Sequence, residues 1–210
     1  MLMVAEQIRK RGVRSPKVLA AMERVPRHLF VPENLAARSY NDEPVPIGEW
    51  QTISQPYMVA AMTEALELEG RERVLEVGAG SGYQAAILAQ LAREVITIEA
   101  RAALADAAGE RLAMLGYGNV RVVTGDGTLG WAEGAPFDAI LVAAAAPQIP
   151  PPLVEQLAEG GRMVIPVGKT DRQMLTRIRK SGGQIVQEQL FLCQFVPLQG
   201  RYGWPASPAE

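Results

Sequence analysis

The chain has one cysteine, one histidine and only 6% aromatic residues, and these low contents exclude several functions. The single cysteine, Cys193, cannot form an internal disulfide, and its apolar neighbours predict a buried position. With so few soft ligands we expect no metal site. No long apolar run occurs, and the N-terminus becomes charged at Glu6, so the sequence predicts neither a signal peptide nor a membrane span.

Positive and negative charges are nearly balanced, which narrows the choice of partners. The 21 lysines and arginines and the 23 acidic residues leave a formal net charge of -2. That balance argues against nucleic-acid binding through bulk electrostatics. The 210 residues, 48% of them hydrophobic, suffice for one domain with a real core. We expect a cytoplasmic protein that has no nucleic-acid or membrane partner and is a monomer by default.

The N-terminal third is expected to be mostly helical. Residues 2–11 predict a short helix, and Ser15-Pro16 begins another helix that ends before Pro26. Residues 26–50 are rich in Pro, Asn, Asp and Gly and have no sustained period. We expect a long irregular segment there, of the kind that is usually functional or mobile. A third helix is predicted over residues 55–68.

From residue 73 onward, short strands alternate with helices. Strands are predicted at 73–77, 95–98, 120–123, 137–142, 163–167, 174–178 and 184–196, and helices at 81–91, 101–115 and 151–158, the last ended by Gly160-Gly161. This alternation predicts an α/β fold, in which a mostly parallel seven-stranded sheet carries helices on both faces. The tight turn at 181–183 makes the last two strands an antiparallel hairpin. The tail after Arg201 is expected to be loose.

The loop from Glu76 to Gly82 is the clearest functional signal. A strand that ends in glycines and opens a helix lets a nucleotide-like ligand approach the backbone. The dinucleotide pattern G-x-G-x-x-G is absent, because Tyr83 stands where its third glycine would be. Glu76 would repel a pyrophosphate but suits the amino group of S-adenosylmethionine. The alternative is a structural turn without a ligand.

Two further acidic residues follow the next two predicted strands. Glu99 lies 21 residues after Gly78, a spacing at which a carboxylate can accept both ribose hydroxyls. Asp126, between Gly125 and Gly127, could accept the adenine amino group. Glu99 alone could be a surface glutamate, and Gly-Asp-Gly alone could be a simple turn. Together with the glycine loop they favour an S-adenosylmethionine pocket on a Rossmann-like class I methyltransferase fold.

At this point the chain resembles the protein-L-isoaspartate O-methyltransferase family over nearly its whole length. The matching stretches are Val25–Pro32, Gln51–Tyr57, Glu76–Ala86 and Phe137–Pro147. The Q-T-I-S-Q-P motif within the second stretch is the most specific of them. One departure is Gly48-Glu49-Trp50, which is bulkier and more acidic than the family's glycine-rich approach to that motif.

The resemblance implies methylation of the free α-carboxylate of an L-isoaspartyl residue in an aged protein. The ester then closes to a succinimide, so the resemblance implies a repair enzyme. Isoaspartyl proteins and peptides are the implied substrates and S-adenosylmethionine the cofactor. The catalytic residue implied is Ser54. The predicted cofactor-binding residues are Ile53, Glu76, Gly78, Ala79, Gly80, Glu99, Asp126 and Gly127. The predicted substrate-binding residues are Thr52, Ser54, Ala143, Ala144 and Val196.

The implied reaction fits a chain with one histidine. A carboxylate with a pKa near 4 is already ionised at pH 7, so its methylation needs no general base. Ser54 could donate a hydrogen bond that aligns the carboxylate with the methyl group, and no Ser-His-acid set surrounds it for covalent catalysis. The alternative role of Ser54 is to cap the helix near Pro56. His28 is expected to have a structural or surface role.

The predicted organisation is one domain, 1–210. Residues 1–70 form a helical segment on the substrate side, 71–168 the cofactor-binding core, and 169–200 the antiparallel strands. Three other functions stay open: a methyltransferase with another acceptor, an NAD(P)-dependent oxidoreductase, and a non-catalytic module that binds S-adenosylmethionine. The Q-T-I-S-Q-P motif argues against the first, Glu76 and Tyr83 against the second, and an intact Ser54 against the third.

Overall fold

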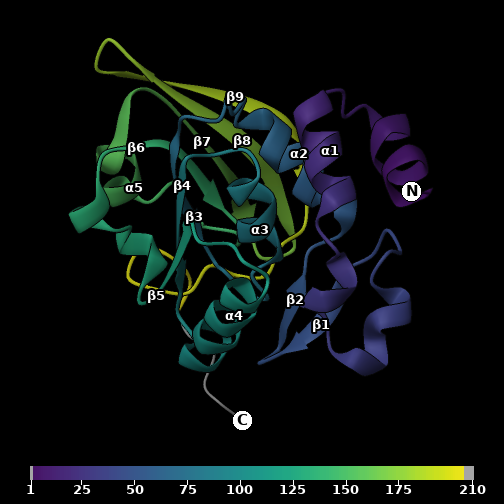
Figure 1. The fold of residues 1–210 in the computed structure, drawn as a ribbon. Coiled ribbons are helices and arrows are strands. Elements are labelled where there is room, and N and C mark those ends of the chain that lie inside the picture. Colours follow the sequence, from purple (N-terminus) through teal and green to yellow (C-terminus); the bar gives the residue numbers. More distant parts are fainter. Residues whose placement is uncertain (1, 206–210) are drawn as a thin grey trace.

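The computed structural model describes residues 2–205 and contains the predicted seven-stranded sheet (Figure 1). Its strand order is β5-β4-β3-β6-β7-β8-β9. The first five of these strands are mutually parallel, and β8 and β9 are antiparallel to their neighbours, as expected. The strands are β3 (Arg73–Val77), β4 (Glu94–Glu99), β5 (Val120–Thr124), β6 (Phe137–Val142), β7 (Leu157–Lys169), β8 (Arg172–Ser181) and β9 (Gln184–Cys193).

Helices cover both faces of this sheet, and β3 shows why. Val74 contributes to a core shared with the N-terminal helices, whereas Leu75 and Val77 belong to the core on the opposite face. Figure 1 shows α1 and α2 on one side of the sheet and α5 on the other. Strands buried on both faces need this double cover. The helices are α1 (Pro16–Arg24), α2 (Pro56–Ala65), α3 (Tyr83–Ala89), α4 (Ala102–Met114) and α5 (Pro151–Gln156). No helix within residues 2–205 is long and apolar enough to cross a membrane.

The expectation of an irregular segment over residues 26–50 is wrong. Short 3-10 turns occupy Arg27–Phe30 and Glu33–Arg38, and they are followed by β1 (Val45–Gly48). β1 pairs in antiparallel fashion with β2 (Gln51–Ile53), so a small hairpin leads into α2. Strands of three and four residues are too short to show an alternating pattern, which explains why the sequence did not reveal them. At the N-terminus, the predicted helix is a π-helical and a 3-10 turn over residues 3–11.

Several C-terminal boundaries also differ from expectation. α5 ends at Gln156, and the two glycines expected to end it, Gly160-Gly161, lie inside the long strand β7. The Lys180 ammonium group donates to the carbonyl oxygens of Val154 (3.3 Å) and Leu157 (2.8 Å), which satisfies the end of the helix. β9 stops at Cys193, three residues early, and Cys193 is only half-buried.

The tail after Arg201 is better ordered than expected. The Arg201 amide donates to Asp126 (2.8 Å), and the Trp204 amide donates to the carbonyl oxygen of Leu198 (2.7 Å). The first bond ties the segment 198–204 to the residues that follow β5, and the second closes a turn within the segment. Residues 206–210 of the tail lie outside the described residues.

Candidate active site

One pocket lies where β3 and its neighbours β4 and β6 reach their carboxyl ends. The chain leaves β3 toward β4 on one side, and β6 joins on the other, so the strand order reverses at this point. Ligands of open α/β sheets bind at such a switch point. The lining comes from the β1–β2 hairpin, the glycine loop, α2, α3, the ends of β4 and β6 and the C-terminal segment. It consists of Gln51–Ser54, Val59, Met62, Val77–Ser81, Tyr83, Gln84, Ile98–Arg101, Gly127, Ala143, Ala144 and Phe195–Gln199.

The glycine loop adopts a conformation that other residues rarely accept. Gly78, Gly80 and Gly82 all have positive φ, at 94°, 53° and 87°. The amide of Gly78 donates to the carbonyl oxygen of Ile98 (2.8 Å), which fixes the loop against β4. A Cβ atom at Gly78 would lie 3.6 Å from that of Ala143. Glycine is therefore required by the backbone at these positions, and it keeps the backbone open to a ligand.

Glu99 lies in the pocket with its carboxylate already engaged. One oxygen accepts the Gly80 amide (2.9 Å) and the other accepts the Arg101 amide (3.1 Å). The side chain is 7% exposed and lines the pocket. A carboxylate has about four acceptor sites, so two amide bonds leave capacity for hydroxyl groups of a ligand.

Glu76 is placed differently from the other acidic residues. It is completely buried on β3, directly before the glycine loop, and is not part of the pocket lining. Neither of its carboxylate oxygens has a hydrogen-bond partner among the described residues. Burial raises the pKa of Glu76 to about 8; the hydroxyl of Thr97, its neighbour on β4, partly opposes this shift although no hydrogen bond of ordinary geometry joins them, and the negative charge of Glu99 adds to the shift. A buried acid without a partner is costly unless a ligand supplies one.

Asp126 also lies outside the lining, although its neighbour Gly127 is in it. Asp126 accepts the amide and the hydroxyl of Thr128 (2.9 and 2.6 Å) and the amide of Arg201 (2.8 Å). At Gly200 a Cβ atom would lie 2.0 Å from the Asp126 carboxylate, so the C-terminal segment is wrapped tightly around it. In this structure Asp126 connects β5 to that segment, and its contact with adenine stays a prediction.

The motif residues Thr52, Ile53 and Ser54 approach the same pocket from the β1–β2 hairpin. Ile53 is 4% exposed, whereas Ser54 is half-buried. The N-cap residue of α2 is Gln55, so Ser54 does not have the alternative capping role. The Tyr57 amide at this helix start donates instead to Asp42 (3.3 Å). The Ser54 hydroxyl makes no hydrogen bond to another described residue, which leaves it available to a ligand.

Small residues and the C-terminal segment form the opposite wall. Ala143 and Ala144 follow β6 and line the pocket, with the Ala143 amide bonded to the carbonyl oxygen of Val77 (2.8 Å). Val196 lines it too, and its carbonyl oxygen accepts the Ala145 amide (2.8 Å). His28 is exposed, and its Nδ1 lies 2.7 Å from the Tyr40 hydroxyl, so its surface role agrees with expectation.

The hairpin turn that departs from the family pattern is strained. Glu49 and Trp50 both have positive φ (50° and 56°), and the Trp50 side chain is 96% exposed. Glu49 lies 3.5 Å from Arg101, and Ile47 would lie 3.3 Å from a Cβ atom at Gly80. The hairpin is therefore in contact with the glycine loop and the end of β4.

Sequence reasoning missed the part of the lining that the helices and most of the C-terminal segment supply. These residues come from one face of α2, the start of α3 and the C-terminal segment: Val59, Met62, Tyr83, Gln84, Phe195, Pro197, Leu198 and Gln199. It also missed Arg27, which is fully buried and donates to the Ser54 carbonyl oxygen (2.7 Å). Arg27 and Tyr83 both stand in the matching stretches, but no local pattern connects either residue to Ser54.

Comparisons with known proteins agree on one family. The family model described as protein-L-isoaspartate(D-aspartate) O-methyltransferase matches residues 2–203. A protein-L-isoaspartate O-methyltransferase from Syntrophus aciditrophicus is 58% identical over 205 residues, which cover 96% of this chain and 94% of that protein. One from Dictyoglomus thermophilum is 54% identical, with 96% and 91% covered.

A solved structure extends the likeness to the fold. It is that of a Plasmodium falciparum protein assigned as a protein-L-isoaspartate O-methyltransferase, in complex with S-adenosyl-L-homocysteine. Its TM-score is 0.82 at 29% identity, and the alignment covers 94% of this chain and 96% of that chain.

Proposed function

We propose, for a chain that belongs to the protein-L-isoaspartate(D-aspartate) O-methyltransferase family, that Ser54 orients the acceptor and the glycine loop holds the cofactor. The enzyme transfers a methyl group from S-adenosylmethionine to the free carboxylate of L-isoaspartyl residues in damaged proteins and peptides. One observation supports both the role of Ser54 and that of the glycine loop. Ser54 and Gly78–Gly80 come from separate parts of the chain and line one pocket.

The residues present fit S-adenosylmethionine. Gly78 and Gly80 leave the backbone open, and Glu99 keeps acceptor capacity for ribose hydroxyls. The buried, unpartnered carboxylate of Glu76 suits the positive amino group of the ligand. When bound, S-adenosylmethionine supplies an electrophilic methyl group on a sulfonium centre. We assign Ile53, Ala79 and Gly127 to the same cofactor, and Asp126 to its adenine.

The chain's own contribution to the chemistry is alignment. The acceptor carboxylate is ionised at pH 7 and needs no base, and no histidine is among the described residues that line the pocket. Ser54 donates its hydroxyl hydrogen to one carboxylate oxygen, which leaves the other oxygen to attack the methyl group. Thr52, Ala143, Ala144 and Val196 bound the space for the peptide. Holding two reactants in line contributes up to roughly 7–11 kcal/mol.

The decisive experiment is transfer of labelled methyl groups to an isoaspartyl peptide and to its normal aspartyl twin. We expect transfer to the isoaspartyl peptide alone, because only that linkage presents a free α-carboxylate at the pocket. Equal labelling of both peptides would refute the repair function, and labelling of neither would favour a different acceptor or a binding module.

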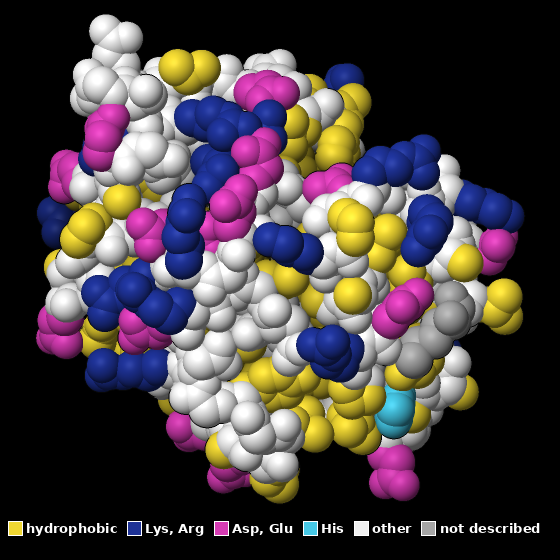
Figure 2. All heavy atoms as spheres, turned by 45° about the horizontal axis from the view of Figure 1, so that its top comes forward, with side chains coloured by type: hydrophobic (Ala, Val, Ile, Leu, Met, Phe, Trp, Pro, Cys, Tyr) yellow, Lys and Arg dark blue, Asp and Glu magenta, His cyan; other side chains and the backbone are white. Residues whose placement is uncertain are grey.

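We also propose that the enzyme acts as a monomer in the cytoplasm, with proteins and not nucleic acids or membranes as partners. The net charge of -2 supports the part of this proposal that excludes nucleic acids and anionic membranes. Figure 2 shows Lys and Arg side chains interleaved with Asp and Glu on the displayed face, and they form no single basic patch there. Light scattering during gel filtration should give a mass near 22.7 kDa, and a value twice that would exclude the monomer.

A further inference from the structure

The backbone carbonyl of Ser54 is held by a buried arginine from a distant turn. Arg27 is fully buried and lies in the turn Arg27–Phe30. Its Nη2 donates to the Ser54 carbonyl oxygen (2.7 Å), and its Nε donates to the carbonyl oxygen of Ser39 (2.6 Å). One planar group therefore connects the Ser54 peptide to the segment that precedes the hairpin.

The surroundings of Arg27 are not those of an ordinary structural ion pair. The guanidinium forms no salt bridge with any described residue, and its Nη1 has no hydrogen-bond partner among them. It lies 4.8 Å from the centre of the Tyr83 ring, and Tyr83 lines the pocket. Burial lowers the pKa of Arg27, and Tyr83 and the more distant negative charge of Asp42 partly oppose this shift, although the groups that Arg27 directly contacts are neutral. Burying a cation against neutral groups is unfavourable for stability. The planar guanidinium group, however, holds its N–H donors in a rigid arrangement, so it fixes the positions of the two carbonyl groups precisely.

A second group reaches the same segment from its other end. Asp42 accepts the side-chain amide of Gln55 (2.8 Å) and the backbone amide of Tyr57 (3.3 Å). Arg27 thus fixes the carbonyl group of Ser54 itself, and Asp42 fixes the start of the helix that follows Ser54. The Ser54 hydroxyl itself has no partner among the described residues, so these contacts fix its Cα–Cβ bond through the backbone and leave the hydroxyl to turn toward a ligand.

We propose that Arg27, assisted by Asp42, is a positioning residue for methyl transfer, which acts by fixing the Ser54 peptide relative to the pocket. Arg27 does not line the pocket, so it acts through Ser54 and Tyr83 and not by contact with the reacting atoms. The inference rests on the proposed role of Ser54. It predicts that methyl transfer depends on the two hydrogen bonds of the guanidinium group, and that a positive charge alone at this position does not support full activity.

The test is a double-mutant cycle of Arg27→Lys with Ser54→Ala, assayed with an isoaspartyl peptide. Lysine keeps the charge but cannot reach both carbonyls in the same geometry. We expect Arg27→Lys alone to lower kcat by about 10- to 100-fold, since small misplacements have effects of that size. The KM for S-adenosylmethionine should stay within about twofold. In the Ser54→Ala background the same substitution should change kcat by less than about threefold, because coupled residues are not additive.

Arg73→Lys is the matched control. Arg73 also donates to a backbone carbonyl, that of Gly134 (2.8 Å), and to Glu94, but it lies at the opposite end of β3 from the pocket. The substitution Arg73→Lys should lower the melting temperature and leave kcat unchanged. An equal loss of kcat from Arg27→Lys in both backgrounds would overturn the proposal, as would full activity of Arg27→Lys.

Two further outcomes remain distinguishable. If Ser54→Ala alone keeps full kcat, the proposed role of Ser54 fails, and the positioning role of Arg27 fails with it. If Arg27→Lys does not fold, Asp42→Ala replaces it in the cycle. That variant should give a smaller fall in kcat that also disappears in the Ser54→Ala background, and an additive fall would overturn the proposal.

Discussion

Residues 73–142 and residues 26–55 line one pocket, but only the first region could be interpreted well from local sequence patterns. In the first region β3, β4 and β6 lie where apolar runs predict them, and the glycines mark the ligand loop. In the second, the irregular segment proved to be two turns and a hairpin that position Ser54. The contrast indicates that the cofactor side is encoded by contiguous patterns, whereas the acceptor side is assembled by contacts between distant residues.

The largest effect that would test this division is expected at Gly78. Gly78→Val places a branched side chain at a φ of 94° and directs it toward the pocket beside Ala143. We expect the Kd for S-adenosylhomocysteine to rise about 100-fold or more, which corresponds to roughly 2.7 kcal/mol. Titration calorimetry measures it. Gly116→Val is the control, because Gly116 has a similar φ of 80° and nothing within 4 Å of a Cβ atom. Equal binding by both variants would contradict the cofactor role of the loop.

The complementary effect is expected from Ser54→Ala, on the acceptor side. Loss of the hydroxyl removes the hydrogen bond that aligns the carboxylate, so kcat should fall by about 10- to 100-fold. The Kd for S-adenosylhomocysteine should stay within about twofold. Ser15→Ala serves as the control: Ser15 caps α1 by accepting the Val18 amide, so its loss should lower stability by about 1 kcal/mol and leave kcat intact. Full turnover by Ser54→Ala at saturating peptide would remove Ser54 from the mechanism.

A pH effect of intermediate size is expected from Glu76. Its pKa is raised from 4.5 to about 8, so its contribution to the stability of the ligand-free protein is present below pH 4.5 and is lost as pH rises through 8. Above pH 8, Glu76→Gln should therefore raise the free energy of unfolding by roughly 1–3 kcal/mol, which is measured as a higher melting temperature. Near pH 4 the substitution should have little effect. The same variant should bind S-adenosylmethionine more weakly, because it lacks the negative charge.

Glu72→Gln is the counterpart of Glu76→Gln, with the opposite sign. Burial opposes ionisation of Glu72, but backbone amides, including those of Glu69, Gly70 and Arg71, outweigh it and lower the pKa. Its stabilising contribution is present above its ordinary pKa and is lost as pH falls through the lowered value. Thermal unfolding at pH 7 should show a lower melting temperature for Glu72→Gln than for the unsubstituted protein. If both variants shift the melting temperature in the same direction at pH 8.5, the difference between the two carboxylates is refuted.

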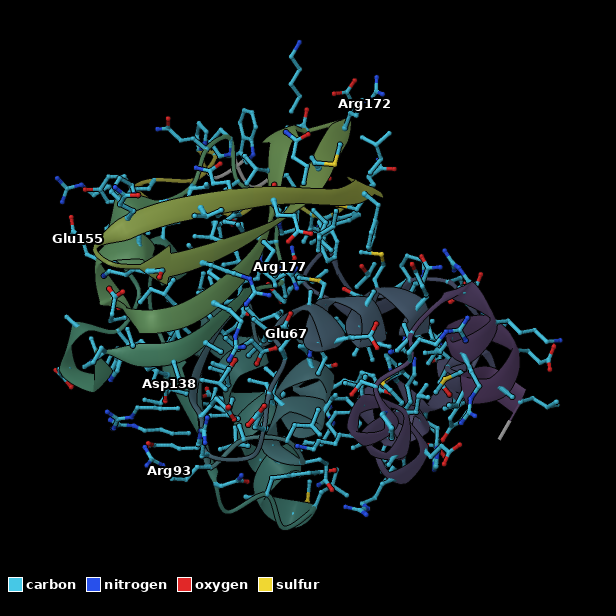
Figure 3. All side chains as sticks on the ribbon, turned by 90° about the horizontal axis from the view of Figure 1, so that it is seen from above. Glu67, Arg93, Asp138, Glu155, Arg172 and Arg177 are labelled. Atoms are coloured by element: carbon cyan, nitrogen blue, oxygen red, sulfur yellow. The ribbon has the colours of Figure 1, made fainter. Side chains whose placement is uncertain are left out.

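The smallest effect is expected at the contact between α2 and the antiparallel strands. Glu67 lies within 3.2 Å of Arg162, Arg177 and Arg179, and Figure 3 shows it facing Arg177 between α2 and the sheet. Burial opposes its ionisation, but these arginines outweigh burial and lower the pKa of Glu67. The group is half exposed, so Glu67→Gln should lose only about 0.5–1 kcal/mol, and less in high salt. Glu155→Gln is the control, because Glu155 is exposed on α5 and forms no ion pair with a described residue. A loss no larger than that of the control would show that the cluster contributes nothing.

Most of the sheet could be predicted because its strands carry the necessary information locally. Val95–Ile98 and Phe137–Val142 are apolar runs that suit strands buried on both faces. The boundary near Gly160 was predicted wrongly, because α5 already ends at Gln156 and β7 pairs with β6 from Leu157, so the two glycines fall in the irregular part of that strand, before its regular pairing resumes at Arg162. Glu99 and the glycine loop both line the pocket, and their contacts with the cofactor stay a prediction. The Gly-Asp-Gly pattern singled out Asp126, but no local signal revealed its bond to the Arg201 amide.

The sequence by itself determined the order of strands and helices, the glycines that open the loop, and the Q-T-I-S-Q-P motif that points to the acceptor. The first two features depend on periodicity and on intrinsic backbone preference, which act over a few residues, whereas the motif indicates the acceptor only through its resemblance to a family. Only the tertiary structure decided that Ser54 and the glycine loop line one pocket, that the Ser54 peptide is held by Arg27, and that Glu76 is buried without a partner among residues 2–205. These depend on burial and on hydrogen bonds between residues far apart in the chain, which no local pattern encodes.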